Sequence, residues 1–313
     1  MTASWRGHEL DGRLLLFDRT SGTNVLLENE RTKRHQRVAP RTVMLALTNV
    51  CNKACTFCYR PADAESRFTF DDVVELARFL DEWGVLELTF GGGEPTLFPR
   101  FAELVNAIWR ETKLCPSFTT NGLRLEQLGL LRQLRGAYGQ LQLSVYEEDE
   151  PLGVIAHLVE ERARFGLNYL VTPARVATLE ARLAEWMGHG VRDVLLLSYK
   201  GADPALQLGD DDCRRLDDSL VRLHRVFGST LTLKVDVCWG DRLPRAPRLF
   251  ESSDCEAGDD FLAISSDRRV QSCSFASAGV AFHDPRELRA LWAKLRSERP
   301  SAGVRGCTRR SHG

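Results

Sequence analysis

Several features of membrane, secreted and nucleic-acid-binding proteins are missing from this chain. No uncharged apolar run is long enough to span a bilayer, and the polar first ten residues lack the apolar core of a signal peptide. No long basic run alternates with aromatic residues, and 42 Lys and Arg nearly balance 43 Asp and Glu. Internal repeats and low-complexity segments are also absent. These absences predict a cytoplasmic globular protein that binds neither membranes nor nucleic acid.

The length and composition of the chain suit one large folded domain with smaller additions. The chain has 313 residues, of which 43% are hydrophobic, and this is enough for a core that needs no disulfides. It also has nine cysteines. In the reducing cytoplasm these are not expected to form structural disulfides, so metal binding, catalysis and burial remain as their roles.

The pattern of elements divides the chain into three parts. Residues 1–40 predict a β-hairpin extension and linker, with strands at 14–17 and 25–27. Residues 41–227 alternate β-rich runs with amphipathic helices, which predicts an α/β fold with a curved parallel sheet and a ligand site beyond the C-terminal strand ends. Residues 228–313 predict a small loop-rich domain. The strands expected in the middle part are 42–48, 85–90, 117–120, 140–145, 168–172 and 193–198.

Three cysteines follow the first of these strands. Cys51, Cys55 and Cys58 lie on one short loop at the C-terminal edge of the expected sheet. Three thiols leave one iron of a cubane cluster open for another ligand, whereas a structural zinc site needs a fourth protein ligand nearby. The motif therefore favours an iron–sulfur cluster over zinc, and buried free thiols are the third alternative.

A glycine-rich segment ends the second strand. Gly91, Gly92 and Gly93 allow a ligand to approach the backbone closely, and Glu94 offers a carboxylate to an ammonium group. Alone, this segment is better explained by a turn between a strand and a helix. Its position beside the cysteine loop, at the end of the neighbouring strand, favours a shared binding site.

Together these motifs resemble the radical S-adenosylmethionine (SAM) superfamily. The resemblance rests on the spacing of Cys51, Cys55 and Cys58, on Gly92, Gly93, Glu94 and Pro95, on the aromatic Phe57, and on residues 119–122 with Asn121. It extends over about residues 42–200 and implies a partial (β/α)6 barrel of the TIM type.

The resemblance also implies cofactors and roles. Cys51, Cys55 and Cys58 would hold a 4Fe-4S cluster whose open iron binds SAM. Reductive cleavage of SAM would produce a 5′-deoxyadenosyl radical that abstracts hydrogen from the substrate. Glu94, with the backbone of Gly92 and Gly93, would hold the SAM amino group. The other SAM-binding residues expected are Phe57, Asn121, Ser144 and Thr172, and Thr172 alternatively serves a turn.

Four more cysteines lie in the C-terminal part. Cys238, Cys255, Cys273 and Cys307 have no zinc-finger spacing, and the segment from Cys255 to Cys273 resembles the auxiliary-cluster domains called SPASM and twitch. The resemblance implies a second 4Fe-4S cluster on these four thiols, with a structural zinc or unligated thiols as alternatives. Cys115 and Cys213 fit neither set and are expected to be packing residues, with a hydrogen-donor or redox role as the alternative.

The resemblance favours a peptide maturase that crosslinks or epimerises a ribosomal peptide. The N-terminal hairpin adds weak support, because a strand edge can bind an extended peptide. A small-molecule radical dehydrogenase or carbon-skeleton enzyme is one alternative, and a cluster-binding protein without SAM chemistry is another. A flavodoxin or ferredoxin is the expected electron donor. Lys200, directly after the sixth strand, is either a solvated residue or a contact for a substrate carboxylate.

Overall fold

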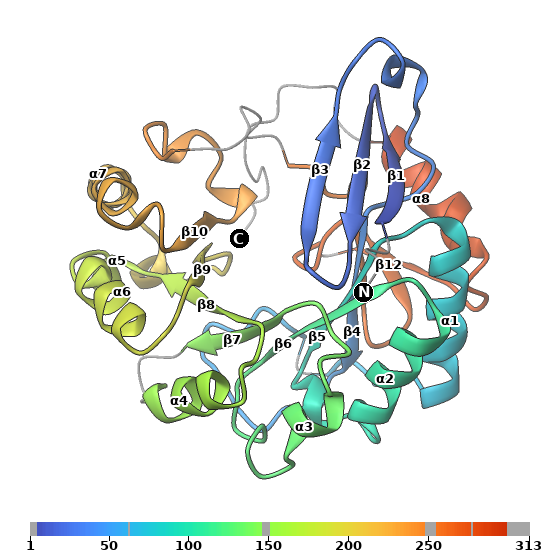
Figure 1. Cartoon of the computed structure of the whole chain (residues 1–313), viewed down its shortest axis with the longest axis horizontal. Coiled ribbons are helices and arrows are strands. Elements are labelled where there is room, and N and C mark those ends of the chain that lie inside the picture. Colours follow the sequence, from blue (N-terminus) through green and yellow to red (C-terminus); the bar gives the residue numbers. More distant parts are fainter. Residues whose placement is uncertain (1–4, 62, 146–150, 248–254, 277, 299–313) are drawn as a thin grey trace.

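The computed structural model describes residues 5–61, 63–145, 151–247, 255–276 and 278–298. Within these ranges the strands form one sheet of three strands and one of ten. The larger sheet is curved, with helices on its outer side (Figure 1). The strands are β1 (Trp5–Leu10), β2 (Arg13–Asp18), β3 (Thr23–Leu27), β4 (Thr42–Thr48), β5 (Glu87–Gly92), β6 (Cys115–Thr120), β7 (Leu141–Val145), β8 (Phe165–Val171), β9 (Asp193–Ser198), β10 (Thr232–Val235), β11 (Phe261–Ile264), β12 (Arg269–Gln271) and β13 (Val280–Ala281). The α-helices are α1 (Phe70–Trp83), α2 (Phe101–Glu111), α3 (Leu130–Leu134), α4 (Leu152–Glu160), α5 (Pro173–Val176), α6 (Leu179–Gly188), α7 (Asp210–Phe227) and α8 (Glu287–Ser297).

The ten-stranded sheet is the predicted partial barrel. Its order is β10-β9-β8-β7-β6-β5-β4-β11-β12-β13, and every pair from β10 to β11 is parallel. In the described ranges its two end strands, β10 and β13, do not pair with each other, so the barrel stays open. The prediction of an α/β fold with this architecture is confirmed. Strands β4 and β9 have the predicted bounds, whereas β8 begins at residue 165 rather than 168.

Helix α1 shows how local sequence starts and ends an element. Thr69 and Asp72 form a capping box at its N-terminus, because each side chain accepts the other residue's backbone N–H. Gly84 ends the helix in the left-handed conformation with φ 107°. Its buried face packs on the sheet, as its hydrophobic spacing predicts; the buried residues are Val73, Val74, Leu76, Ala77, Leu80 and Trp83.

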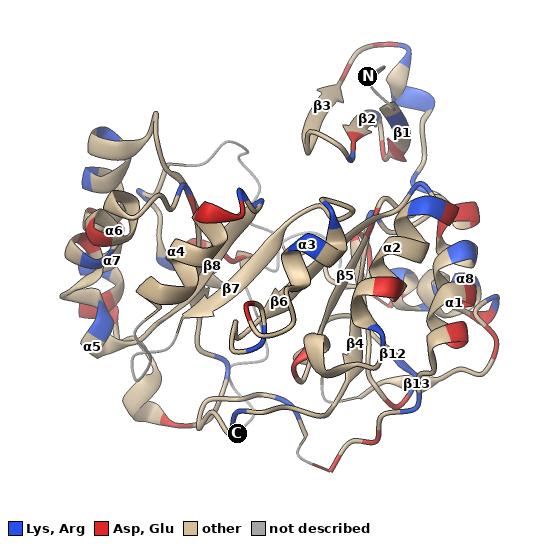
Figure 2. Cartoon of the chain, turned by 60° about the horizontal axis from the view of Figure 1, so that its bottom comes forward, with Lys and Arg blue, Asp and Glu red and all other residues tan. Residues whose placement is uncertain are grey.

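The N-terminal residues form an accessory sheet of three antiparallel strands, not only the predicted hairpin. Strand β1 pairs with β2 and was not expected from the sequence. Leu15 and Phe17 of this sheet pack against Leu86 and Cys115, which lie where β5 and β6 begin. The accessory sheet therefore covers the N-terminal ends of the barrel strands, away from the edge that carries the two motifs. Figure 2 shows it standing at one end of the central strands.

The C-terminal part continues the central sheet. Strand β10 pairs in parallel with β9, and β11 pairs in parallel with β4 at the other side of the barrel. Strands β12 and β13 then extend the sheet in antiparallel fashion. The boundary predicted at residue 228 thus falls within one continuous sheet rather than between two sheets.

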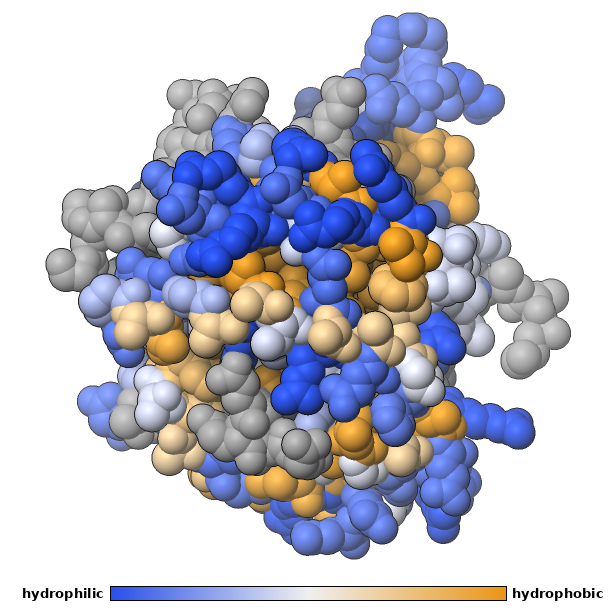
Figure 3. All heavy atoms as spheres, turned by 90° about the vertical axis from the view of Figure 1, so that its left-hand side faces the viewer, coloured by the Kyte–Doolittle hydropathy of each residue, from blue (hydrophilic) through white to orange (hydrophobic). Residues whose placement is uncertain are grey.

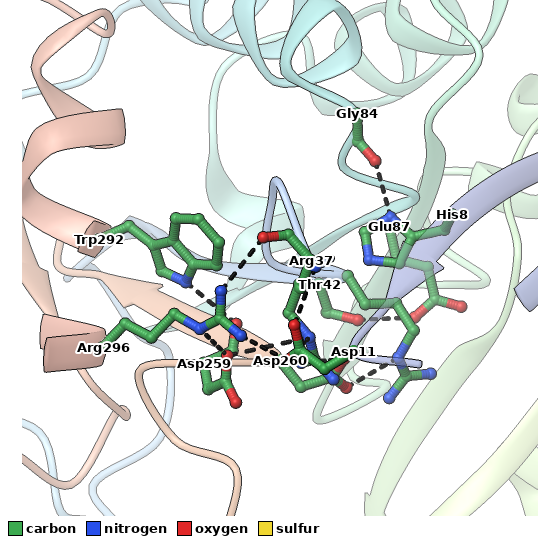
Figure 4. A network of polar contacts seen from close by, with 11 residues as sticks. His8, Asp11, Arg37, Thr42, Gly84, Glu87, Asp259, Asp260, Trp292 and Arg296 are labelled. Carbon is green, nitrogen blue, oxygen red and sulfur yellow. Dashed lines mark hydrogen bonds and ion pairs between the residues drawn. The ribbon is translucent and has the colours of Figure 1, made fainter. Parts of the chain in front are cut away.

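A network of ion pairs joins the linker to the C-terminal part (Figure 4). Arg37, which is 6% exposed, binds Asp260 at 2.8 Å. The Asp260 backbone carbonyl accepts hydrogen bonds from the backbone N–H groups of Arg41 and Thr42, so it also fixes the start of β4. Arg296 of α8 binds Asp259 at 2.8 Å and pairs with Asp11 of the accessory sheet. The Arg37–Asp260 and Arg296–Asp11 pairs connect segments more than two hundred residues apart in sequence.

The outer surface is strongly polar over α7. Ion pairs there include Arg215 with Asp212 at 2.7 Å and Arg222 with Glu180 at 2.7 Å. Hydrophilic side chains gather in the upper half of this face of the molecule, at the height of α7 (Figure 3). In the part of the chain that the structure describes, no helix combines the length and the apolar character needed to cross a membrane.

Candidate active site at the C-terminal edge of the barrel

The cysteine loop follows β4 directly. Cys51 and Cys55 are half-buried and Cys58 is exposed. The base of the loop is held by Asn49, whose side chain donates to the carbonyls of Pro61 (3.0 Å) and Ala64 (2.8 Å). Within the described ranges, no three Cys, His, Asp or Glu side chains are arranged to hold a metal ion.

The glycine segment packs against the base of this loop. Gly93 N donates to Thr48 O at 2.7 Å, and Glu94 N donates to Val50 O at 2.9 Å. A Cβ on Gly92 would lie 2.5 Å from Thr48 O, and Gly92 has a φ of 99° that side chains rarely adopt. A Cβ on Gly93 would overlap the Val50 carbonyl group. In this structure the glycines therefore admit the neighbouring backbone, which joins the two motifs.

Glu94 links the ends of β5 and β6 and is 1% exposed. Its Oε1 accepts hydrogen bonds from Thr96 N (3.2 Å), Thr96 Oγ1 (2.6 Å) and Thr120 Oγ1 (2.7 Å). Its Oε2 accepts a hydrogen bond from Asn121 N at 2.8 Å. A carboxylate has about four acceptor positions, two on each oxygen, so Oε2 can accept one more donor.

Asn121 connects this carboxylate to the cysteine loop. Its backbone N–H binds Glu94, and its side-chain Nδ2 donates to Asn52 Oδ1 at 2.7 Å. Because Asn52 follows Cys51, the ends of β4, β5 and β6 form one hydrogen-bonded unit. The sequence pattern indicated each of these segments but could not show this connection.

The other expected SAM-binding residues lie at the same edge or on the loop. Phe57 is half-buried between Cys55 and Cys58. Ser144 is half-buried at the penultimate position of β7. Thr172 is 6% exposed and directly precedes α5, where its side chain makes no capping hydrogen bond. All three positions remain predicted contacts.

The three described C-terminal cysteines lie beside three different strands. Cys238 follows β10, Cys255 precedes β11, and Cys273 follows β12; all three are half-buried. Cys307 lies outside the described residues. The second cluster therefore stays a prediction. Cys115 and Cys213 are buried, as expected for packing residues.

Lys200 and Asp236 lie close together near the barrel edge, and the sequence indicated only Lys200. The Lys200 side chain is 6% exposed, so it is not the solvated residue that was one alternative. It donates to Ser198 Oγ and lies 3.7 Å from Asp236 Oδ2. Burial raises the pKa of Asp236, and the nearby Lys200 opposes this effect. Asp236 gave no sequence signal, because it is 36 positions from Lys200 and follows a different strand.

An aromatic contact also joins the two cysteine groups. The ring of Tyr59, next to Cys58, lies 4.4 Å from the ring of Phe275, centroid to centroid. Phe275 is two residues after Cys273. The cysteine loop and the segment after β12 are therefore in contact, which no spacing rule could predict.

A family model for the radical SAM superfamily matches residues 45–165, the segment from β4 to the start of β8 that carries both motifs. The chain contains a radical SAM domain. The prediction of a radical SAM domain is confirmed for these residues.

Curated proteins with similar sequences match this chain over a limited length. GTP 3′,8-cyclase of Photorhabdus laumondii is 35% identical over 89 residues, which are 26% of this chain and 27% of the relative. PqqA peptide cyclase of Gluconobacter oxydans is 30% identical over 114 residues, 36% of this chain and 32% of the relative. The matches thus span about a quarter to a third of these curated relatives.

Solved structures share the fold over most of the chain. Streptococcus suis SuiB bound to S-adenosylmethionine has a TM-score of 0.74 at 14% identity, covering 96% of this chain and 91% of SuiB. The enzyme anSMEcpe with bound AdoMet has a TM-score of 0.62 at 16% identity, covering 83% of this chain and 80% of that one. At these identities the likeness is one of fold.

The superfamily implies a 4Fe-4S cluster and SAM. The donor set fits: three thiols on one loop leave an open iron, and the remaining acceptor position of Glu94 Oε2 lies on the neighbouring strand end. Among the described residues there is no equivalent support for a second cluster, and Cys307 lies outside them.

Proposed function

We propose that this protein is a radical SAM enzyme that cleaves SAM reductively and abstracts hydrogen from a peptide substrate. The proposal rests mainly on the radical SAM domain, which contains the cysteine loop and Glu94 in one hydrogen-bonded unit. Bound together, the cluster and SAM supply a 5′-deoxyadenosyl radical. The protein supplies the ligands, the orientation of SAM and the exclusion of water.

Each motif has a defined task in this proposal. Cys51, Cys55 and Cys58 bind three irons through their thiolates. Glu94 accepts the SAM ammonium group on Oε2, while its other acceptor positions stay bonded to the protein. We expect Ser144 and Thr172 to contact other parts of SAM, because they lie near or just after the ends of neighbouring strands.

A peptide is the substrate class we favour. SuiB has been solved with its precursor peptide SuiA, and anSMEcpe with a bound peptide, and both share this chain's fold. PqqA peptide cyclase is also among the sequence relatives. Crosslinking or epimerisation of a ribosomal peptide is the reaction type that we favour, as the sequence resemblance implied.

The accessory sheet gives less support to a peptide substrate than its strand edge suggests. It packs on the N-terminal ends of β5 and β6, whereas the motifs lie at the C-terminal ends. Strands of six or seven residues separate these two ends by about 20 Å. A peptide bound on β3 would have to extend around the barrel to reach SAM.

A nucleotide substrate is the second candidate, because GTP 3′,8-cyclases are 30 to 36% identical to segments of this chain. Addition of GTP to reduced, SAM-loaded protein tests it. We expect no increase in 5′-deoxyadenosine formation. A clear increase would favour the nucleotide candidate over the peptide.

Loss of the three loop cysteines tests the proposal as a whole. Anaerobically reconstituted protein with dithionite should form 5′-deoxyadenosine from SAM. The triple variant Cys51→Ala, Cys55→Ala, Cys58→Ala should form none, since methyl groups cannot bind iron. Cys213→Ala is the control, because Cys213 is buried beside Arg242, away from the loop. Undiminished turnover in the triple variant would contradict the assignment of the cluster to these cysteines. If the wild type forms no 5′-deoxyadenosine, the alternative of a binding protein without SAM chemistry is favoured.

A further inference from the structure

Lys200 is a buried cation at the edge of the barrel where the motifs lie. It is the second residue after β9, and its side chain is only 6% exposed. Burial of an ammonium group is costly unless polar partners surround it. The Lys200 ammonium group therefore depends on protein groups, rather than on water, for its polar contacts.

Its partners come from two strand ends. Lys200 Nζ donates to Ser198 Oγ, and Asp236 Oδ2 lies 3.7 Å away. Asp236 follows β10 and is fixed by Ser198, whose backbone N–H (2.9 Å) and hydroxyl (3.0 Å) both donate to it. A distance of 3.7 Å is too long for a hydrogen bond, so the Lys200 and Asp236 charges are close but not directly bonded.

Phe275 links this pair to the cysteine loop. Lys200 Nζ lies 5.9 Å from the centre of the Phe275 ring, which in turn contacts the Tyr59 ring at 4.4 Å. Tyr59 is adjacent to Cys58. Strands β9 and β12 are far apart in the sheet order, so this contact joins segments from two distant parts of the sheet.

Both members of the pair retain hydrogen-bonding capacity. An ammonium group has three donors, and among the described residues Ser198 Oγ is the acceptor within hydrogen-bond distance of Lys200. Asp236 accepts from the Ser198 N–H and hydroxyl and from the Cys238 backbone, which leaves about one of its four acceptor positions. The pair thus presents spare donors beside a spare acceptor.

We propose that Lys200 and Asp236 bind the backbone C=O and N–H of one extended residue of the substrate peptide, with Phe275 and Tyr59 as an apolar wall for its side chain. In an extended strand the C=O and N–H of a residue point to the same side, as in the hydrogen-bonded pairs of antiparallel sheets. This inference rests on the proposed peptide substrate and assigns the residues that recognise it.

The charges argue against an anionic ligand. The formal charges of Lys200 and Asp236 cancel, and a carboxylate or phosphate bound to Lys200 would lie close to the Asp236 carboxylate. Like charges this close repel each other. A neutral amide avoids this cost and uses both the donor and the acceptor.

Saturation-transfer NMR with small probes tests the site. Reconstituted, SAM-loaded, unreduced protein is mixed with N-acetyl-leucine methylamide, N-acetyl-leucine or inorganic pyrophosphate. The methylamide should give the strongest signal. Lys200→Met should weaken it about fivefold, as expected for the loss of one hydrogen bond, and Lys200→Arg should keep most of it. Lys294→Met is the control, because Lys294 is 64% exposed on α8.

Several outcomes would overturn the assignment. An unchanged methylamide signal in Lys200→Met, a stronger signal from pyrophosphate, or no methylamide binding to the wild type would each do so. Thermal melting checks that Lys200→Met is folded, and Lys200→Gln replaces it if it is not. Wild-type protein that binds the methylamide but forms no 5′-deoxyadenosine on reduction would sink the proposed function alone.

Discussion

Glu94 combines a structural and a binding task in one side chain. Three of its hydrogen bonds are made through Oε1 and one through Oε2, and together they tie the ends of β5 and β6. Its near-complete burial means that loss of the charge leaves several donors without a partner. A substitution should therefore affect both stability and SAM binding.

Glu94→Gln separates these two effects. The amide keeps one oxygen acceptor but brings its NH₂ group against a protein donor, so stability should fall by about 1 to 3 kcal/mol. The lost charge should lower SAM affinity by roughly 10- to 100-fold. Thermal melting measures the stability and anaerobic calorimetry measures the SAM affinity. Glu103→Gln is the control, because the Glu103 side chain is exposed on α2. Lower stability with unchanged SAM affinity would make Glu94 purely structural.

Gly92 and Gly93 show why a residue's role depends on its partner in space. From the sequence, their missing side chains suggested close approach of a ligand. In the folded chain the nearest atoms are those of residues 46 to 50, so the absent Cβ atoms admit the base of the cysteine loop. In both interpretations the missing Cβ atoms make room for a close neighbour, but in the structure that neighbour is the base of the cysteine loop and not a ligand.

At the scale of elements, the accessory sheet closes the base of the barrel. Cys115, at the start of β6, is buried between this sheet and the barrel, and its Sγ faces Arg19 O at 4.0 Å. Burial raises the pKa of Cys115 to about 12. Only roughly one Cys115 thiol in ten thousand would then be ionised at pH 8.

Thiol labelling can therefore report on the docking of the accessory sheet. In unloaded, reduced protein at pH 8, iodoacetamide should label Cys58 at least about 100-fold faster than Cys115, since the thiolate is the reactive form. Removal of residues 1–30, or Leu15→Ala with Phe17→Ala, should speed labelling of Cys115. Peptide mass spectrometry measures the rates.

Cys213 is the internal control for this experiment. It is buried at α7, far from the accessory sheet in sequence, and should stay protected in every variant that keeps the barrel folded. Equal protection of Cys115 after removal of the accessory sheet would show that the sheet does not shield it.

At the scale of the whole molecule, ion pairs join the N-terminal part of the described chain to its C-terminal part. Arg37 and Asp260 form a buried ion pair, and Arg296 joins α8 to Asp259 and to the accessory sheet (Figure 4). Removal of one partner of such a pair leaves a buried charge uncompensated. The linker, β4 and the segment before β11 therefore hold one another in place, next to the strand that leads into the cysteine loop.

Iron counts test whether the C-terminal cysteines form a second site. With an auxiliary cluster, wild-type protein should bind about eight irons per chain, and Cys255→Ala with Cys273→Ala should bind about four. The Cys213→Ala variant should match the wild type. Metal analysis after anaerobic reconstitution gives the counts.

Two other results would exclude the second cluster. About four irons with one zinc would indicate a structural zinc site, and about four irons alone would make these cysteines packing residues. The contact between Tyr59 and Phe275 adds a further expectation, because the two cysteine groups touch. Changes in the cysteine loop should then also affect the segment that carries Cys273.

The sequence by itself determined the features that depend on local spacing. The bounds of β4 and β9, the capped ends of α1 and the α/β alternation follow from periodicity and capping residues close together in the chain. The positions of the two motifs at strand ends follow from the same pattern. These features depend only on interactions between residues that are close together in the sequence.

The tertiary structure alone decided the contacts between segments far apart in sequence. Strand β1, the return of β11 to the side of β4, the placement of the accessory sheet at the base of the barrel, and the meeting of Lys200 with Asp236 and Phe275 left no periodic signal. Each depends on which surfaces are buried together when the sheet curves. That choice is made by the packing of the whole chain, because no short segment contains both partners.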